Sequence, residues 1–229
     1  MGDAGRKKMA VGEKITREKI IRAVLDSAFD KSVGGTSLAD ISEKLGIKKA
    51  SLYNHYESRD AMIEDTVTYC GDLLRKTSFI PTDMAATAQK YPAETVLKGI
   101  VNRWIKLNEK EPLLQVYIFV ESEKYFSNES AAIVSETRKK LIEQTASALT
   151  ALSEAQKIKP LDAAAAKDYA VIFASTVRDI LDIFLTDKKV QIRSNPETGA
   201  DTLFASIPAG EPDFSEIDTL IEQFCNLIK

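Results

Sequence analysis

The chain has 229 residues and a formal net charge of −3, from 31 lysines and arginines against 34 aspartates and glutamates. Hydrophobic residues make up 44% and charged residues 28%, which is typical of a folded globular protein and argues against a disordered one. No stretch approaches the roughly 18 apolar residues that span a bilayer, and the polar N-terminus lacks the apolar run of a signal peptide. We therefore expect a soluble, cytoplasmic protein with no membrane partner.

Charge is distributed unevenly along the chain. Residues 1–60 hold 12 basic and 9 acidic residues, whereas the remainder holds 19 basic and 25 acidic residues. A basic N-terminal part is compatible with binding to nucleic-acid phosphates, although a difference of this size also arises by chance. Residues 1–15, which include Arg6, Lys7 and Lys8, are expected to form a flexible basic arm. Such an arm either enters a minor groove or is a disordered tail.

Helical periodicity begins directly after this arm. A first helix is predicted after Thr16, and a second, LADISEKL, follows the N-cap Ser37 and ends at Gly46. A short third helix, KASLYNHY, comes next, and Ser58 is a good N-cap for a long fourth helix. Segment 77–92 has prolines near both ends and is predicted to be a connector.

The later part of the chain also shows helical periodicity, and the whole sequence predicts an all-α protein of about nine helices. The later helices are predicted at about 93–109, 113–124, 129–153, 162–186 and 215–228. Segment 187–214 is rich in turn formers and is predicted to be a long loop. The apolar stripes of the last two helices pack either into their own core or into a subunit interface.

The third predicted helix separates two kinds of residue by rotation at 100° per position. Leu52 and Tyr56 share one face, which we expect to pack on the first two helices at Ile21, Leu25, Ile41 and Leu45. Ala50 and Asn54 point the opposite way, with Ser51 and Tyr53 on the flanks and with Lys48 and Lys49 in the first turn.

This polar face has the chemistry of a helix that enters the major groove of DNA. Lysines pair with phosphate or guanine, asparagine pairs with adenine, and a small alanine contacts a thymine methyl group. Each residue also has an ordinary alternative. Lys48 and Lys49 could be solvated charges, Tyr53 could be half-buried at a helix junction, and His55 could be packed or capping.

The stretch TSLADISEKLGIKKASLYNHYESRDAM closely resembles the DNA-binding segment of the tetracycline-repressor (TetR) family. The resemblance covers roughly residues 16–63 and is carried by Thr36-Ser37, Ile41, Leu45-Gly46-Ile47, Leu52-Tyr53, His55-Tyr56 and Ser58-Arg59. By matching position, it implies DNA contacts at Ser37, Lys49, Ala50, Ser51, Tyr53, Asn54, His55 and Arg59. The chain departs from the family pattern at Lys48, where a serine-like N-cap is usual, and at Ser42, where alanine is common.

The resemblance also implies an architecture and partners. Residues 16–62 would form a three-helix helix-turn-helix DNA-binding domain, and residues 63–229 a larger helical regulatory and dimerisation domain. The partners would be a pseudo-palindromic double-stranded DNA operator, a small-molecule effector, and a second copy of the chain bound through helices 162–186 and 215–228. Candidate effector contacts, each of which could equally be plain core or surface, are Arg103, Trp104, Tyr117, Phe119, Glu121, Tyr125 and Phe173.

The sequence bears on two other classes of function. An enzyme is disfavoured because His55 is the only histidine, neither Cys70 nor Cys225 has an activating neighbour, and no metal-ligand spacing or phosphate-binding glycine loop occurs. No cofactor or metal is predicted. An architectural or partner-binding DNA-binding protein without a small-molecule ligand remains the alternative to a ligand-controlled repressor.

Overall fold

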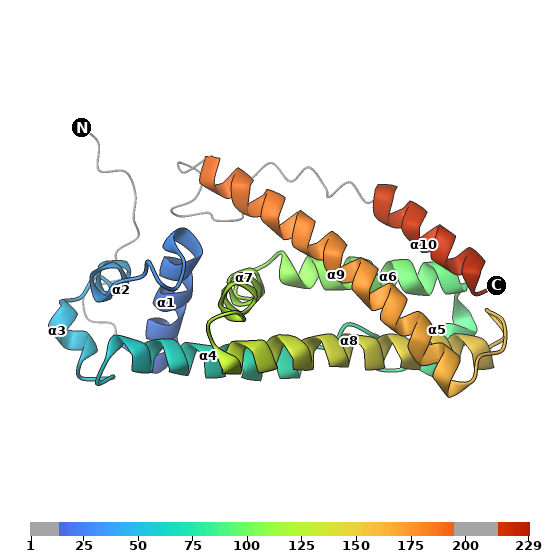
Figure 1. Cartoon of the computed structure of the whole chain (residues 1–229), viewed down its shortest axis with the longest axis horizontal. Coiled ribbons are helices and arrows are strands. Elements are labelled where there is room, and N and C mark those ends of the chain that lie inside the picture. Colours follow the sequence, from blue (N-terminus) through green and yellow to red (C-terminus); the bar gives the residue numbers. More distant parts are fainter. Residues whose placement is uncertain (1–13, 195–214) are drawn as a thin grey trace. The chain divides into compact units, whose positions relative to one another are not determined.

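The computed structural model describes residues 14–194 and 215–229, and within these ranges all regular structure is helical (Figure 1). The described residues contain ten helices, with none long and apolar enough to cross a membrane. Their bounds are α1 Arg17–Lys31, α2 Leu38–Leu45, α3 Lys49–Leu52, α4 Arg59–Lys76, α5 Met84–Lys90, α6 Ala93–Asn108, α7 Leu113–Glu123, α8 Asn128–Glu154, α9 Ala163–Ser194 and α10 Ser215–Leu227.

The described residues divide into two compact units. The first unit contains residues 14–77 and 110–135, and the second contains residues 78–109, 136–194 and 215–229. Helices α1 to α4, α7 and the first turns of α8 therefore belong to the first unit. The functional division expected after residue 62 is a separate question and stays a prediction.

The first unit is built on caps that the sequence displays. Thr16 caps α1 through its side chain, which accepts a hydrogen bond from the N–H of Lys19. Ser37 and Asp40 form a capping box at the start of α2, and Gly46 ends this helix in the left-handed conformation, at φ 64°. Such caps satisfy backbone groups that a helix end leaves without intrahelical partners. The turn between α2 and α3 is thereby fixed.

One apolar cluster forms the core of this unit. The predicted contact face is confirmed. Leu52 is fully buried in one cluster with the four residues expected to contact it, and the partly buried Tyr56 packs against this cluster. The four residues are Ile21, Leu25, Ile41 and Leu45. Side chains of α7 and α8 complete the cluster, namely Val116, Phe119, Val120 and Ile133. Burying Leu52 in this way contributes about 1.5–3 kcal/mol relative to exposing it.

The second unit is held by aromatic and ionic contacts. The Trp104 ring of α6 packs edge-on against Phe79 at 5.4 Å between centroids, and Phe173 of α9 lies 5.0 Å from Phe224 of α10. Lys98 of α6 also forms ion pairs with two acidic residues of α10, one of them at 3.2 Å from Glu222. These contacts join α10 to both α6 and α9.

Two sequence predictions were wrong at this level. The connector 77–92 contains a helix, α5, because the Asp83 side chain accepts a hydrogen bond from the N–H of Ala86 and Met84 is buried on the inner face. The helix predicted at 162–186 continues to residue 194, since the buried Ile192 extends the inward stripe beyond Leu185. Residues 187–194 are thus not a loop. The rest of that predicted loop, and residues 1–13 of the predicted arm, lie outside the described residues.

Candidate nucleic-acid interface

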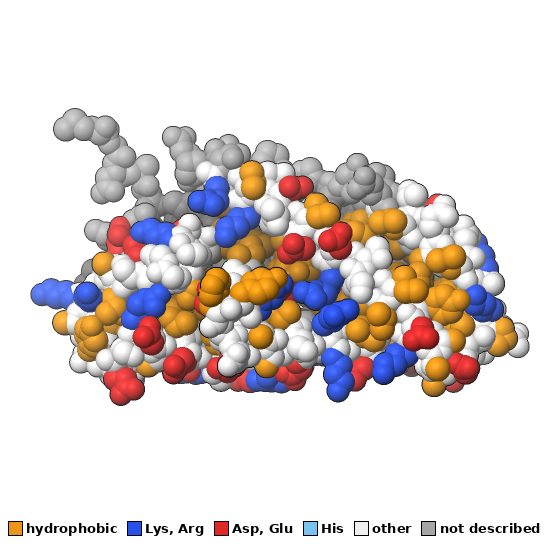
Figure 2. All heavy atoms as spheres, viewed as in Figure 1, with side chains coloured by type: hydrophobic (Ala, Val, Ile, Leu, Met, Phe, Trp, Pro, Cys, Tyr) orange, Lys and Arg blue, Asp and Glu red, His pale blue; other side chains and the backbone are white. Residues whose placement is uncertain are grey.

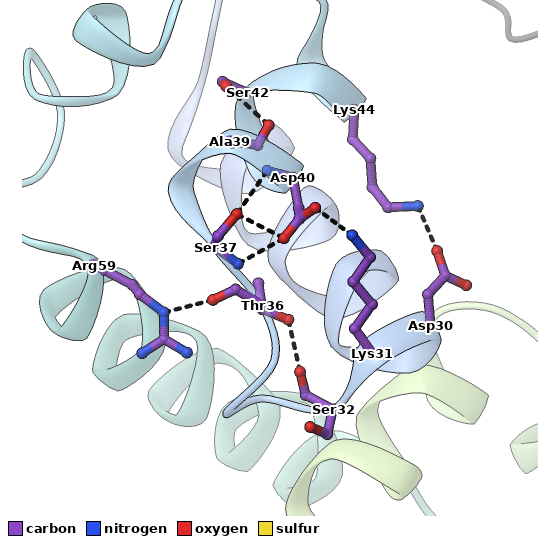
Figure 3. A network of polar contacts seen from close by, with 10 residues as sticks. All are labelled: Asp30, Lys31, Ser32, Thr36, Ser37, Ala39, Asp40, Ser42, Lys44 and Arg59. Atoms are coloured by element: carbon purple, nitrogen blue, oxygen red, sulfur yellow. Dashed lines mark hydrogen bonds and ion pairs between the residues drawn. The ribbon is translucent and has the colours of Figure 1, made fainter.

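The start of α2 presents the first of the predicted contact residues, Ser37. Its side-chain oxygen accepts a hydrogen bond from the N–H of Asp40, and its own N–H donates to the Asp40 carboxylate at 2.8 Å (Figure 3). Lys31 of α1 pairs with the same carboxylate, and the hydrogen bonds from Lys31 and Ser37 hold the pKa of Asp40 far below its usual range. Ser37 is exposed, but its hydroxyl already serves the cap.

The recognition segment is shorter as a helix than the sequence predicted. Helix α3 covers only Lys49–Leu52, and a turn follows it in place of the remaining helix of KASLYNHY. The turn keeps a helical bond, since the N–H of Tyr56 donates to the Leu52 carbonyl at 3.1 Å. Lys48 is the N-cap residue and its side chain makes no capping hydrogen bond, as expected from the missing serine. A cap of the usual kind would contribute about 1 kcal/mol.

The predicted contact residues of this segment are brought together on one exposed surface. Six of them are exposed, and Ser51 is partly buried on the flank. The six exposed residues are Lys48, Lys49, Ala50, Tyr53, Asn54 and His55. Tyr53 is 52% exposed, which still fits the alternative of a half-buried ring, whereas His55 is exposed and its imidazole is not packed in the core.

The charge of this surface suits an anionic partner. The first turn of α3 carries no acidic residue, while Lys48 and Lys49 both lie exposed at its start. Figure 2 shows lysine and arginine side chains protruding at the end of the first unit where Figure 1 places α3. A basic surface with exposed hydroxyl and amide groups can bind phosphates and reach base edges.

Arg59, the last residue of the predicted set, is already engaged within the domain. Its Nε donates to the Thr36 carbonyl at 2.7 Å, and a terminal nitrogen donates to the Val33 carbonyl (Figure 3 shows the contact with Thr36). A third contact, at 3.2 Å, pairs the guanidinium with Asp60. Arg59 thus ties the start of α4 to the loop that precedes α2.

The sequence reasoning missed a second polar cluster behind the recognition segment. Asp65 of α4 accepts a forked pair of hydrogen bonds from Arg17 of α1, one of them at 2.7 Å, and also accepts a hydrogen bond from the Tyr56 hydroxyl. Arg17 and Asp65 are 48 positions apart, so no local periodicity could have paired them. Only the tyrosine in place of a purely apolar residue hinted at a polar partner.

The seven predicted effector contacts are divided between the two units. Tyr117, Phe119, Glu121 and Tyr125 belong to the first unit, and Arg103, Trp104 and Phe173 belong to the second. Three of the seven have surroundings that do not by themselves indicate a ligand contact. Phe119 lies in the first unit's core, Trp104 packs on Phe79, and Tyr125 is 79% exposed. Their common role as one site stays a prediction.

A short helix that displays a polar, basic face after a capped helix and a tight turn has the geometry of a helix-turn-helix segment. Residues 20–66 match the family model described as bacterial regulatory proteins, tetR family. Over this segment the chain is similar to DNA-binding regulators of the TetR family.

Curated relatives agree over the same segment. The chain is 40% identical over 58 residues to the biofilm operon icaADBC HTH-type negative transcriptional regulator IcaR of Staphylococcus aureus, strain Newman. It is 39% identical over 54 residues to IcaR of Staphylococcus epidermidis. The matches span only 31% and 29% of the lengths of these relatives, and 25% and 24% of this chain.

Solved structures show the same fold over most of the chain. A transcriptional regulator from Rhodococcus sp. Rha1 has a TM-score of 0.54 at 14% identity, with 93% of this chain and 96% of that one covered. AibR in complex with isovaleryl coenzyme A and operator DNA has a TM-score of 0.51 at 19% identity, and the match covers 72% of this chain and 85% of AibR. A TetR transcription regulator from Haloarcula marismortui has a TM-score of 0.53 at 10% identity, covering 93% and 97%. At these identities the likeness concerns the fold alone.

Proposed function

We propose that this protein is a dimeric, sequence-specific repressor that binds a pseudo-palindromic DNA operator and responds to a small molecule. The observation that carries the proposal is the exposed basic and polar surface of α3 and its turn, on a domain of TetR type. The negative regulator IcaR supports the repressor role. AibR, bound to both isovaleryl coenzyme A and operator DNA, supports the operator and the effector.

Dimerisation is supported by an apolar stripe on the outer side of α9. Ile172, Ile183 and Val190 are spaced by 11 and 7 residues, so they share one face, and each is at least 52% exposed. The opposite face of α9 is buried. Leu220 and Leu227 of α10 are likewise exposed and 7 residues apart, and Figure 2 shows hydrophobic side chains at the surface over both helices. Exposed apolar faces of this kind mark protein–protein contacts.

The dimer is tested by sedimentation of a charged variant. Ile172→Glu with Ile183→Glu places two carboxylates on the proposed interface and should yield monomers. The matched control is Phe126→Glu, which makes the same kind of change at an 85% exposed position outside α9 and α10. Equal sedimentation of the native protein and the α9 variant would refute this interface.

DNA reading is tested by selection of bound sequences from a random double-stranded library. The native protein should enrich a palindrome whose half-sites lie one helical turn, or a multiple of it, apart. The variant Lys49→Ala with Tyr53→Ala should enrich nothing while unfolding at the same temperature, because both side chains are exposed. Enrichment of the same palindrome by this variant would show that another surface reads the DNA.

The effector is tested through Trp104, the only tryptophan. Its ring is 3% exposed and contacts Phe79, so a ligand that displaces either ring should change its fluorescence. Acyl-coenzyme A esters are the first compounds to try, given AibR. No change with any compound that alters operator binding would move the effector site away from Trp104.

A further inference from the structure

Helix α3 is too short to hold its own position. It has four residues and no side-chain cap, and the exposed residues Tyr53 to His55 follow it in a turn. Forming a first helical turn is unfavourable in isolation, so tertiary contacts must set the geometry of such a segment. Within residues 49–56 these contacts come from Leu52, which is fully buried, and Tyr56, which is partly buried on the same core, and Ile47 packs on that core just before the helix.

Leu52 supplies only a non-directional contact. An apolar side chain in a core resists withdrawal but fixes rotation about its own axis weakly, since hydrophobic burial has no directional preference. Tyr56 differs because its hydroxyl donates a hydrogen bond to the Asp65 carboxylate of α4. A hydrogen bond to an ionised group has a defined length and angle, and it is stronger than one between neutral groups.

Asp65 is itself held from a third element. The Arg17 guanidinium at the first position of α1 donates to both carboxylate oxygens of Asp65, a planar arrangement that also fixes the carboxylate's orientation. The hydrogen bonds from Arg17 and then from Tyr56 lower the pKa of Asp65, so the carboxylate is ionised. Burial and the bond to Asp65 raise the pKa of Tyr56, so the phenol keeps its proton. Donor and acceptor are therefore in the states that the contact requires.

We propose that Arg17, Asp65 and Tyr56 are positioning residues for DNA reading, with the Asp65 carboxylate fixing the turn that carries Tyr53, Asn54 and His55. This inference rests on the proposed function, because it assigns these residues to the same DNA-reading surface. None of the three residues needs to touch DNA. They set the angle at which α3 and its turn leave the core formed with α1 and α4.

The first experiment measures this order without DNA. Amide hydrogen exchange at His55 and Tyr56, whose N–H groups donate to the Leu52 carbonyl, reports opening of the turn. Tyr56→Phe removes one oxygen atom and should speed exchange at both amides about tenfold. Tyr69→Phe is the matched control, because Tyr69 is also partly buried against the same core. Unchanged exchange in Tyr56→Phe would overturn the inference.

The second experiment measures affinity for the selected operator and for random DNA at a temperature where every variant is folded. Tyr56→Phe and Asp65→Asn should each weaken operator binding about tenfold and leave random-DNA binding within about twofold, since the phosphate-binding charges remain. The double variant Tyr56→Phe with Asp65→Asn should lose less operator affinity than the product of the two single fold-changes, because the two groups act through one hydrogen bond. Asp72→Asn, which removes an exposed α4 ion pair with Arg75 at 2.8 Å, is the control and should change neither affinity.

The outcomes separate the two proposals. A native protein that selects an operator, with variants that bind it as tightly as the native protein does, would overturn the positioning role alone. Selection of no sequence by the native protein would overturn the proposed function and the positioning role together. Equal loss of operator and random-DNA affinity would also count against positioning, because it would indicate a lost phosphate contact.

Discussion

Replacing Arg59 with alanine distinguishes a DNA contact from an internal brace. The side chain is 30% exposed and donates to the carbonyls of Thr36 and Val33. Hydrogen bonds from a charged group contribute about 1.5–3 kcal/mol when buried, and solvent access reduces this, so we expect Arg59→Ala to cost about 1–2 kcal/mol of stability. Arg59→Lys should recover only part of it, because an ammonium lacks the guanidinium's forked geometry.

Two measurements on the same variant decide the question. Urea unfolding gives the stability change, and operator affinity measured over a range of salt concentrations gives the number of phosphate contacts. For an internal brace, stability falls while the slope of log affinity against log salt stays as in the native protein. A slope reduced by about one contact with stability unchanged would refute our reasoning and place the guanidinium on a phosphate.

Three further predictions concern stability and reactivity. Gly46→Ala should lower the free energy of unfolding by about 1–2 kcal/mol, measured by thermal unfolding. The backbone conformation, at φ 64°, is the sole reason, because a Cβ at this position meets no atom within 4 Å. Burial, and then the nearby Glu111, raise the pKa of Asp26 to about 6, so the folded state binds a proton more tightly than the unfolded state, and stability should fall as pH rises from about 4 through 6. Asp26→Asn should remove this decline, worth at most about 3 kcal/mol, in urea unfolding at successive pH values. The thiols of Cys70 and Cys225 are buried and have raised pKa values, so Ellman's reagent should label neither in the folded protein and both in urea; rapid labelling of the folded protein would contradict this.

The sequence predicted those parts of the fold that depend on local patterns. Caps at Thr16 and Ser37 and the turn at Gly46 all appear where residue type and spacing indicated them. Both missed helical segments bury apolar side chains. Helix α5 buries Met84 and Ala88, and the extension of α9 buries Ile192. Short polar segments contain no periodic signal strong enough to show such contacts.

In the candidate site, too, local periodicity predicted the exposed residues but not the long-range contacts. Rotation about a helix axis correctly separated Leu52 from the exposed Ala50 and Asn54. It could not show that Arg59 bonds to carbonyl groups of the loop before α2, nor that Asp65 lies beside Arg17, because both contacts join residues more than 20 positions apart. Side chains that point at DNA were thus visible in the sequence, and those that hold the reading segment in place were not.

The brevity of α3 has a consequence for evolution and engineering. Its position depends on Leu52 and Tyr56. The exposed residues before Leu52, and those between Leu52 and Tyr56, contribute little to the core. Exchanges at Lys49, Ala50 and Asn54 should therefore alter which bases are preferred without unfolding the domain. A lineage could acquire a new target promoter through a few such exchanges, and a combinatorial library at these positions should remain folded in nearly every member.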